Sequence, residues 1–65
     1  MEDRVKRMIV AIDILKAAIS KDVHCMISCE MRYERASNDR TLEGIKQGLI
    51  ELALDVLCGE QPLPL

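Results

Sequence analysis

The chain has 65 residues, of which 49% are hydrophobic and 31% charged, with a formal net charge of −2. This length allows one small domain, and the acidic balance argues against a protein that coats nucleic acid, because such a protein needs a basic surface to release counterions. The three cysteines are an odd number and no signal peptide is apparent, so we expect a reducing, cytoplasmic location.

The first predicted helix spans about residues 3–20. Neither glycine nor proline occurs before Gly44, and a chain without helix breakers that is rich in aliphatic residues satisfies its backbone most simply as helices. Five apolar residues follow the 3-4-3-4 spacing of one helical face, namely Val5, Met8, Ile12, Leu15 and Ile19. Other apolar residues, such as Ile14, lie off this face, so we expect the helix to need more than one neighbour. The charges of Asp13 and Lys16 make this segment too polar to cross a membrane.

The second predicted helix covers about residues 22–37. Ser20, Lys21 and Asp22 form the only polar interruption before residue 30, and either Ser20 or Asp22 could cap a new helix. An unbroken helix from the first segment to Ala36 would be about 50 Å long. Since the last helix could cover little more than half of that length, we favour a break at residues 20–22.

The second segment contains the residues that could bind a metal, namely His24, Cys25 and Cys29, with Cys58 as a distant third thiol. A structural zinc site needs four ligands, usually with the CxxC spacing that this chain lacks. We therefore interpret the cysteines as small hydrophobic residues and predict no metal and no cofactor. His24 has no serine or carboxylate placed by the sequence to form a catalytic relay, so we predict no catalytic residue and no enzymatic activity.

A cluster of basic and aromatic residues surrounds the turn that we predict between the second and third helices. Its members are Arg32, Tyr33, Arg35 and Arg40. Arginine forks bind phosphate in bidentate fashion and a tyrosine ring can stack on a base, so the cluster could bind a nucleotide-type small molecule. The neighbouring acidic residues, among them Glu30, Glu34 and Asp39, could instead neutralise the arginines and leave a salt-bridged surface.

The third predicted helix spans about residues 40–58. It follows the turn-forming sequence of residues 37–41, in which Asp39 or Thr41 could be the N-cap. Gly59 is well placed to end the helix. Residues 59–65 form an extended tail that contains two prolines and two leucines, and we expect it to lie against its own oligomer or a partner.

This third segment also carries the predicted oligomer interface. Its leucines, isoleucine and valine follow an unbroken a/d seam, and Gly44 and Gly48 lie one turn apart, which favours close approach of another helix, within the chain or across a subunit boundary. The predicted interface residues are Leu42, Gly44, Ile45, Gly48, Leu49, Leu52 and Val56.

The predicted fold is therefore all-α, with a single helical domain over residues 1–58. A chain of this size buries only about 60% of its unfolded surface, so its stability as a monomer is marginal and self-association is expected. We expect two to three helices that form an antiparallel helical hairpin and pack into a homo-oligomeric bundle.

The last helix resembles that of the phage anti-CBASS proteins, a family that sequesters cyclic nucleotide signals. In that family the last helix of a helical hairpin begins with Arg-x-Leu and ends before a proline, and here Arg40-Thr41-Leu42 and Pro62 match that layout. The family's late arginine is absent from Leu54-Asp55-Val56. The resemblance implies a helical homo-oligomer that binds cyclic nucleotides between subunits without cleaving them, with Arg40 as a ligand-contacting residue.

Two functions follow as expectations. The first is a regulator, adaptor or inhibitor that docks on another protein through a helix face or the tail. The alternative is a phage-type anti-defence protein that sequesters a phosphate-bearing small molecule at a subunit interface. Nucleic-acid binding is disfavoured by the acidic charge and the single aromatic residue.

Overall fold

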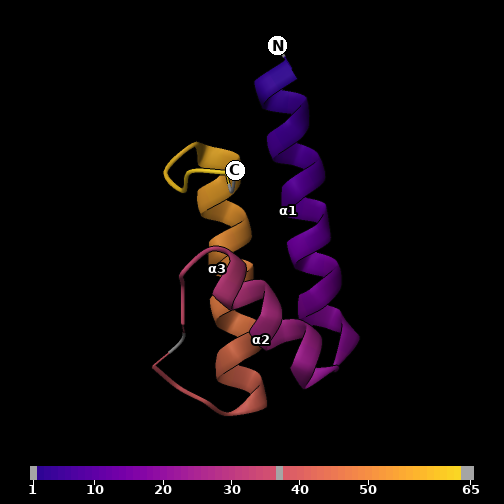
Figure 1. Ribbon diagram of the computed structural model, residues 1–65, viewed down its shortest axis with the longest axis vertical. Coiled ribbons are helices and arrows are strands. Elements are labelled where there is room, and N and C mark those ends of the chain that lie inside the picture. The colour runs from indigo at the N-terminus through magenta and orange to yellow at the C-terminus, as the bar shows by residue number, and fades with distance from the viewer. Residues whose placement is uncertain (1, 37, 64–65) are drawn as a thin grey trace.

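The computed structural model describes residues 2–36 and 38–63, which form three helices: α1 (Glu2–Ser20), α2 (Val23–Arg32) and α3 (Leu42–Cys58). Figure 1 shows α1 and α3 side by side with opposite chain directions, while the short α2 packs across their lower end. The molecule measures 36 × 19 × 18 Å. The prediction of an all-helical fold is confirmed, since the described residues contain no strand.

The predicted break between the first two helices is also confirmed. Lys21 takes a left-handed backbone conformation with a φ of 62°. The Ser20 hydroxyl donates to the carbonyl of Ala17 at 2.7 Å and accepts from the N–H of Asp22 at 3.2 Å. The Asp22 carboxylate in turn accepts from the N–H of Cys25 at 3.3 Å, so that it caps α2.

α2 ends at Arg32, about one turn before the end that the sequence predicted. The chain turns away because Glu34 takes a left-handed conformation with a φ of 55°. The N–H of Arg35 donates back to the carbonyl of Glu30 at 2.9 Å, the pattern of a Schellman cap. Glycine usually occupies the position of Glu34 in such a cap, so this helix end could not be predicted from the residue type.

α3 begins and ends as predicted. The Thr41 hydroxyl accepts from the N–H of Gly44 at 3.1 Å and makes Thr41 the N-cap. Asp39 fixes that cap, because its carboxylate accepts from both the N–H and the hydroxyl of Thr41, at 3.0 and 2.7 Å. At the other end, Gly59 has a φ of 82° and the N–H of Glu60 donates to the carbonyl of Asp55.

The core lies between α1 and α3, and α2 closes its lower end. α1 contributes mainly small side chains, which let α3 approach closely, and α3 contributes the larger ones. The buried apolar residues are Ala11, Ile14, Ala17, Ala18, Met26, Cys29, Tyr33, Ile45, Leu49, Leu52, Ala53 and Val56.

The apolar stripe that the sequence singled out on the first helix faces away from this core. Its members are 38–69% exposed: Val5, Met8, Ile12, Leu15 and Ile19. Ile14, which lies off the stripe, is only 1% exposed and packs in the core. The alanine-rich side of α1 is the side that faces the core, because small side chains allow α1 and α3 to pack closely. None of the described helices is both long and apolar enough to cross a membrane.

Candidate functional site

The predicted ligand cluster is divided between the core and the surface. Tyr33 is 7% exposed, so its ring is packed inside the molecule, and burial raises the pKa of its hydroxyl. Arg35 donates from Nη1 to the carboxylate of Asp55 at 2.9 Å and to Oε1 of Gln61 at 3.0 Å. Arg35 therefore ties the loop after α2 to the end of α3, while Arg32 remains exposed.

Glu30 and Arg40 form the most buried ion pair of the described residues. The Glu30 side chain is 4% exposed, and its Oε1 accepts from Nη1 of Arg40 at 3.0 Å. Sequence reasoning assigned Glu30 to a solvated surface. The signal for its burial was its spacing, since it lies four residues after Met26 and three before Tyr33, both of which are in the core.

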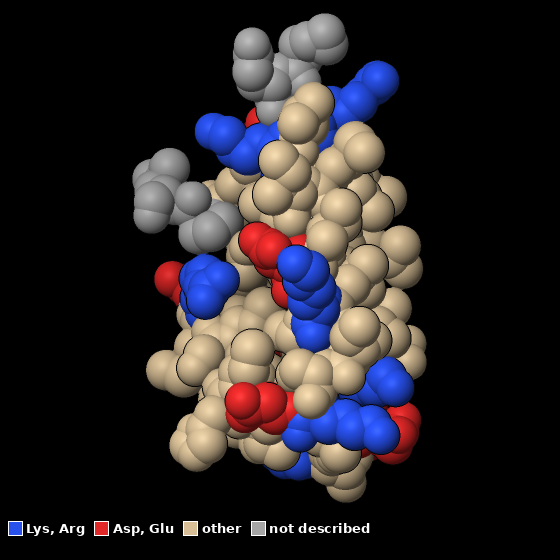
Figure 2. Space-filling view, turned by 90° about the vertical axis from the view of Figure 1, so that its right-hand side faces the viewer, with Lys and Arg blue, Asp and Glu red and all other residues tan. Residues whose placement is uncertain are grey.

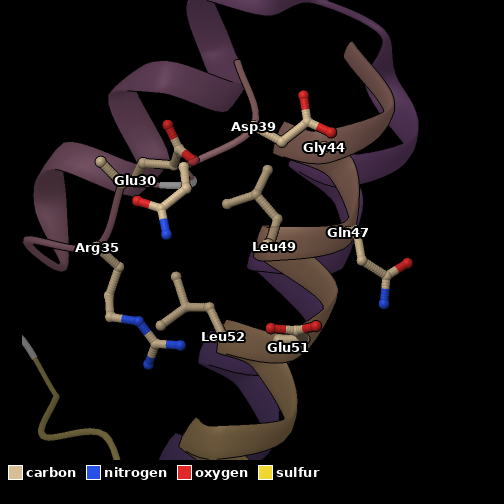
Figure 3. Close-up of a pocket in the computed structure, with 11 residues that line it drawn as sticks. Glu30, Arg35, Asp39, Gly44, Gln47, Leu49, Glu51 and Leu52 are labelled. Atoms are coloured by element: carbon tan, nitrogen blue, oxygen red, sulfur yellow. The ribbon is translucent and has the colours of Figure 1, made fainter. Parts of the chain in front are cut away.

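A cavity of about 410 Å³ opens between the loop before α3 and α3 itself. Figure 3 shows Glu30 and Arg35 on one side of it, facing Leu49 and Leu52. Asp39 and Glu51 also line the cavity, which therefore carries three carboxylates and one guanidinium. This acidic balance opposes a phosphate-bearing ligand, because like charges repel strongly where water is partly excluded.

The candidate metal ligands do not come together. Cys29 is buried, whereas Cys25 and Cys58 are exposed. Burial raises the pKa of the Cys29 thiol, which keeps it protonated and unsuited to binding a cation. Within residues 2–36 and 38–63, no three histidine, cysteine or acidic side chains gather into a group that could hold a metal ion.

Most of the predicted oligomer interface is used by the chain to fold on itself. Four of its residues are only 0–3% exposed and belong to the core: Ile45, Leu49, Leu52 and Val56. Gly44 is half-buried because Asp39 lies against it, and a Cβ there would overlap with the side chain and carbonyl oxygen of Asp39. Gly48 is also half-buried, and Leu42 is 43% exposed. The four core side chains are therefore covered within the chain itself, whereas Leu42 remains accessible to a second copy.

Among the described residues, exposed large hydrophobic side chains are most numerous on the outward side of α1. We define the α1 outer face by six residues that are each 38–69% exposed: Val5, Met8, Ile9, Ile12, Leu15 and Ile19. Figure 2 views the molecule from the α1 side and shows a mostly tan surface with several charged side chains across it, including an acidic and a basic one near the middle of the view. Leu54 and Leu57 of α3 are 55% and 47% exposed, and Leu57 lines a shallow pocket together with Met8.

Comparison with known proteins gives no match for this chain. No protein-family model matches it, and neither a curated protein nor a solved structure is significantly similar to it. The resemblance of the last helix to the anti-CBASS family stays a prediction.

Proposed function

We propose that this protein is a small, non-enzymatic helical module that forms a homo-oligomeric bundle and acts in the cytoplasm by docking on another protein, as a regulator, adaptor or inhibitor. The observation that carries the proposal is the α1 outer face, where six aliphatic side chains stay between 38% and 69% exposed. Contiguous apolar surface on a small protein is typical of a protein–protein contact.

The polar groups of the described residues support binding rather than catalysis. Arg35 and Arg40 are engaged with Asp55 and Glu30, so they hold the loop before α3 in place. Among the described residues, no buried side-chain nitrogen or oxygen lacks a hydrogen-bond partner. Catalytic sites commonly hold polar groups in strained or poorly satisfied arrangements, and these groups are satisfied.

The test is affinity purification of the tagged chain from its source cell, with quantitative mass spectrometry. We expect untagged copies of the chain and one heterologous protein to be retained in constant ratio. Ile12→Arg, in the α1 outer face, should lose at least one of these contacts. Met31→Arg makes the same chemical change at a residue of α2 that is 72% exposed, and it should retain both. A monomer that retains no other protein would contradict the proposal.

A phosphate-bearing small molecule, such as a cyclic nucleotide, is the alternative ligand. The observation that favours it is a second cavity, of about 330 Å³, which both Arg35 and Arg40 line and which offers enough room for a small molecule. Thermal or urea unfolding with added cyclic nucleotide should then show stabilisation of about 2.7 kcal/mol at a hundredfold excess over Kd. Arg40→Ala should abolish the ligand-dependent part of that gain. An equal gain in the variant would exclude a site at Arg40.

A further inference from the structure

We infer that the α1 outer face is covered by the same face of a second copy, in an antiparallel homodimer. This inference rests on the proposed self-association and names the surface that performs it. It moves the interface from α3, where the sequence placed it, to the opposite helix.

The α1 outer face supplies part of the area that such a contact needs. α1 has 19 residues and is therefore about 28 Å long, and at a helix width of about 10 Å its outward side has a footprint of roughly 300 Å². The largest apolar patch on a typical monomer covers about 300–600 Å² and is often functional. The exposed Leu54 and Leu57 extend the surface onto α3, toward the roughly 800 Å² that a stable interface buries on each partner.

The spacing of the surface specifies a helix as its occupant. Val5, Met8, Ile12, Leu15 and Ile19 follow a heptad repeat through the whole of α1, and side chains at this spacing fit into the holes of a helix with the same repeat. All of the α3 seam except Leu42 is buried in the core, so among the described residues only α1 offers this repeat at the surface. A second α1 has the same length and spacing, and such self-complementary contacts close into two-fold dimers.

Charges beside the stripe favour the antiparallel arrangement. Asp13 and Lys16 are both exposed on one flank of the stripe, and neither makes an ion pair within the described part of the chain. A two-fold axis between Ile12 and Leu15 places this flank against itself, with Lys16 within about one helical turn of Asp13 of the second copy. Two reciprocal ion pairs result. In a parallel pair, this flank would instead face Arg4, Ala11 and Ala18.

The first experiment measures the mass of the full chain by sedimentation equilibrium from micromolar to submillimolar concentration. We expect a reversible monomer–dimer equilibrium. Ile12→Arg places a charge at the centre of the contact and should raise the dimer dissociation constant more than about 30-fold. Met31→Arg should leave it unchanged. Circular dichroism checks that both variants stay helical, which the outward position of both side chains favours.

The second experiment tests the direction of the helices by charge exchange. Lys16→Asp should weaken the dimer about 3- to 10-fold, because it replaces two attractive pairs with two repulsive ones. The double variant Asp13→Lys with Lys16→Asp should restore the dimer to within about threefold of the original constant. Lys46→Asp, the same charge change on α3, is the matched control and should have no effect.

The outcomes separate this inference from the proposed function. A dimer that Ile12→Arg leaves intact would overturn the α1 interface while leaving self-association standing. A monomer at every concentration would overturn the inference, and the proposed function would then survive only if the source-cell purification retained a heterologous protein. If Ile12→Arg abolishes the dimer but Lys16→Asp leaves its dissociation constant unchanged, the antiparallel arrangement is overturned.

Discussion

Two polar residues and one glycine determine where α3 starts. Asp39 accepts two hydrogen bonds from Thr41, and Thr41 accepts one from the N–H of Gly44. Asp39 also lies so close to Gly44 that a Cβ at that position has no room. The glycine that the sequence suggested for helix packing thus serves the cap of its own helix.

Gly44→Ala should destabilise the protein by about 1–3 kcal/mol, the usual cost of overpacking. In an open helix the same change would stabilise it by about 0.5–1 kcal/mol, so the sign of the effect is diagnostic. Urea unfolding measures it. Gln47→Ala, at an exposed position one turn later, should be close to neutral. A stabilised Gly44→Ala variant would show that Asp39 does not pack against this glycine.

The Asp39 cap should also make stability depend on pH. The backbone N–H of Thr41, and then its hydroxyl, hold the pKa of the Asp39 carboxyl below its usual value near 3.8. A group whose pKa is lower in the folded state stabilises above its unfolded pKa, and that stability is lost as the pH falls through the folded value.

Asp39→Asn keeps the accepting oxygen but removes the titration. Unfolding measured between neutral pH and about pH 2.5 should therefore show a smaller loss of stability for the variant than for the original chain below about pH 4. Parallel curves for the two proteins would show that Asp39 does not contribute to the acid sensitivity.

Glu34 stops α2 at some cost in backbone strain. A left-handed conformation costs a residue with a Cβ about 1–2 kcal/mol, and Glu34 has a φ of 55°. Glu34→Gly should therefore stabilise the protein by about 0.5–1 kcal/mol after its greater freedom in the unfolded chain is counted. Thermal unfolding measures the gain. Ser28→Gly, within α2, should instead lower the stability by about 0.5 kcal/mol. A loss of stability in both variants would show that Glu34 is not strained.

At the scale of elements, Arg7 joins the first turns of α1 to the end of α3. Its Nη1 donates to the carbonyls of Val56 and Gln61, both at 3.0 Å, and its Nε contacts the carboxylate of Asp3. The first of these carbonyls lies in the last turn of α3, where helix carbonyls have no partner within the helix. Arg7 therefore supplements the Gly59 cap from another element.

Arg7→Gln should cost about 1–2 kcal/mol, because hydrogen bonds from a charged donor contribute more than neutral ones. Hydrogen exchange at residues 59–61 should quicken more than exchange in the middle of α3. Arg4→Gln, at an exposed position of the same helix, should change neither quantity. Equal exchange rates in the Arg7→Gln and Arg4→Gln variants would show that the Arg7 contacts do not stabilise the end of α3.

The sequence predicted the elements better than their packing, for a physical reason. Caps and breaks act over three or four residues, so the sequence narrowed each N-cap to two candidates, which included Asp22 and Thr41, and placed Gly59 at the end of α3. Which face of α1 is buried depends on a partner distant in the sequence. Close packing against α3 favours the side of Ala11, Ala17 and Ala18 over the side with larger aliphatic residues. The surface that we propose for docking changed with that choice, from α3 to α1.

For the whole molecule, self-association through α1 would link thermal stability to concentration. A dimer that is folded only as a pair, or more stable as a pair, gains stability by mass action as concentration rises. The midpoint of thermal unfolding should therefore rise with protein concentration for the original chain and for Met31→Arg. It should stay constant for Ile12→Arg. If the midpoint is independent of concentration in all three proteins, dimer formation does not contribute to the stability of the fold.

The position of Arg7 has a mechanical consequence. α1 begins and α3 ends at the same end of the molecule (Figure 1), and the guanidinium of Arg7 bridges them there. A force that pulls the two chain ends apart would meet this bridge first, and would then peel the two helices from each other one turn at a time. Such a load breaks contacts in sequence rather than all at once, so the fold should yield gradually under tension although it unfolds cooperatively in denaturant.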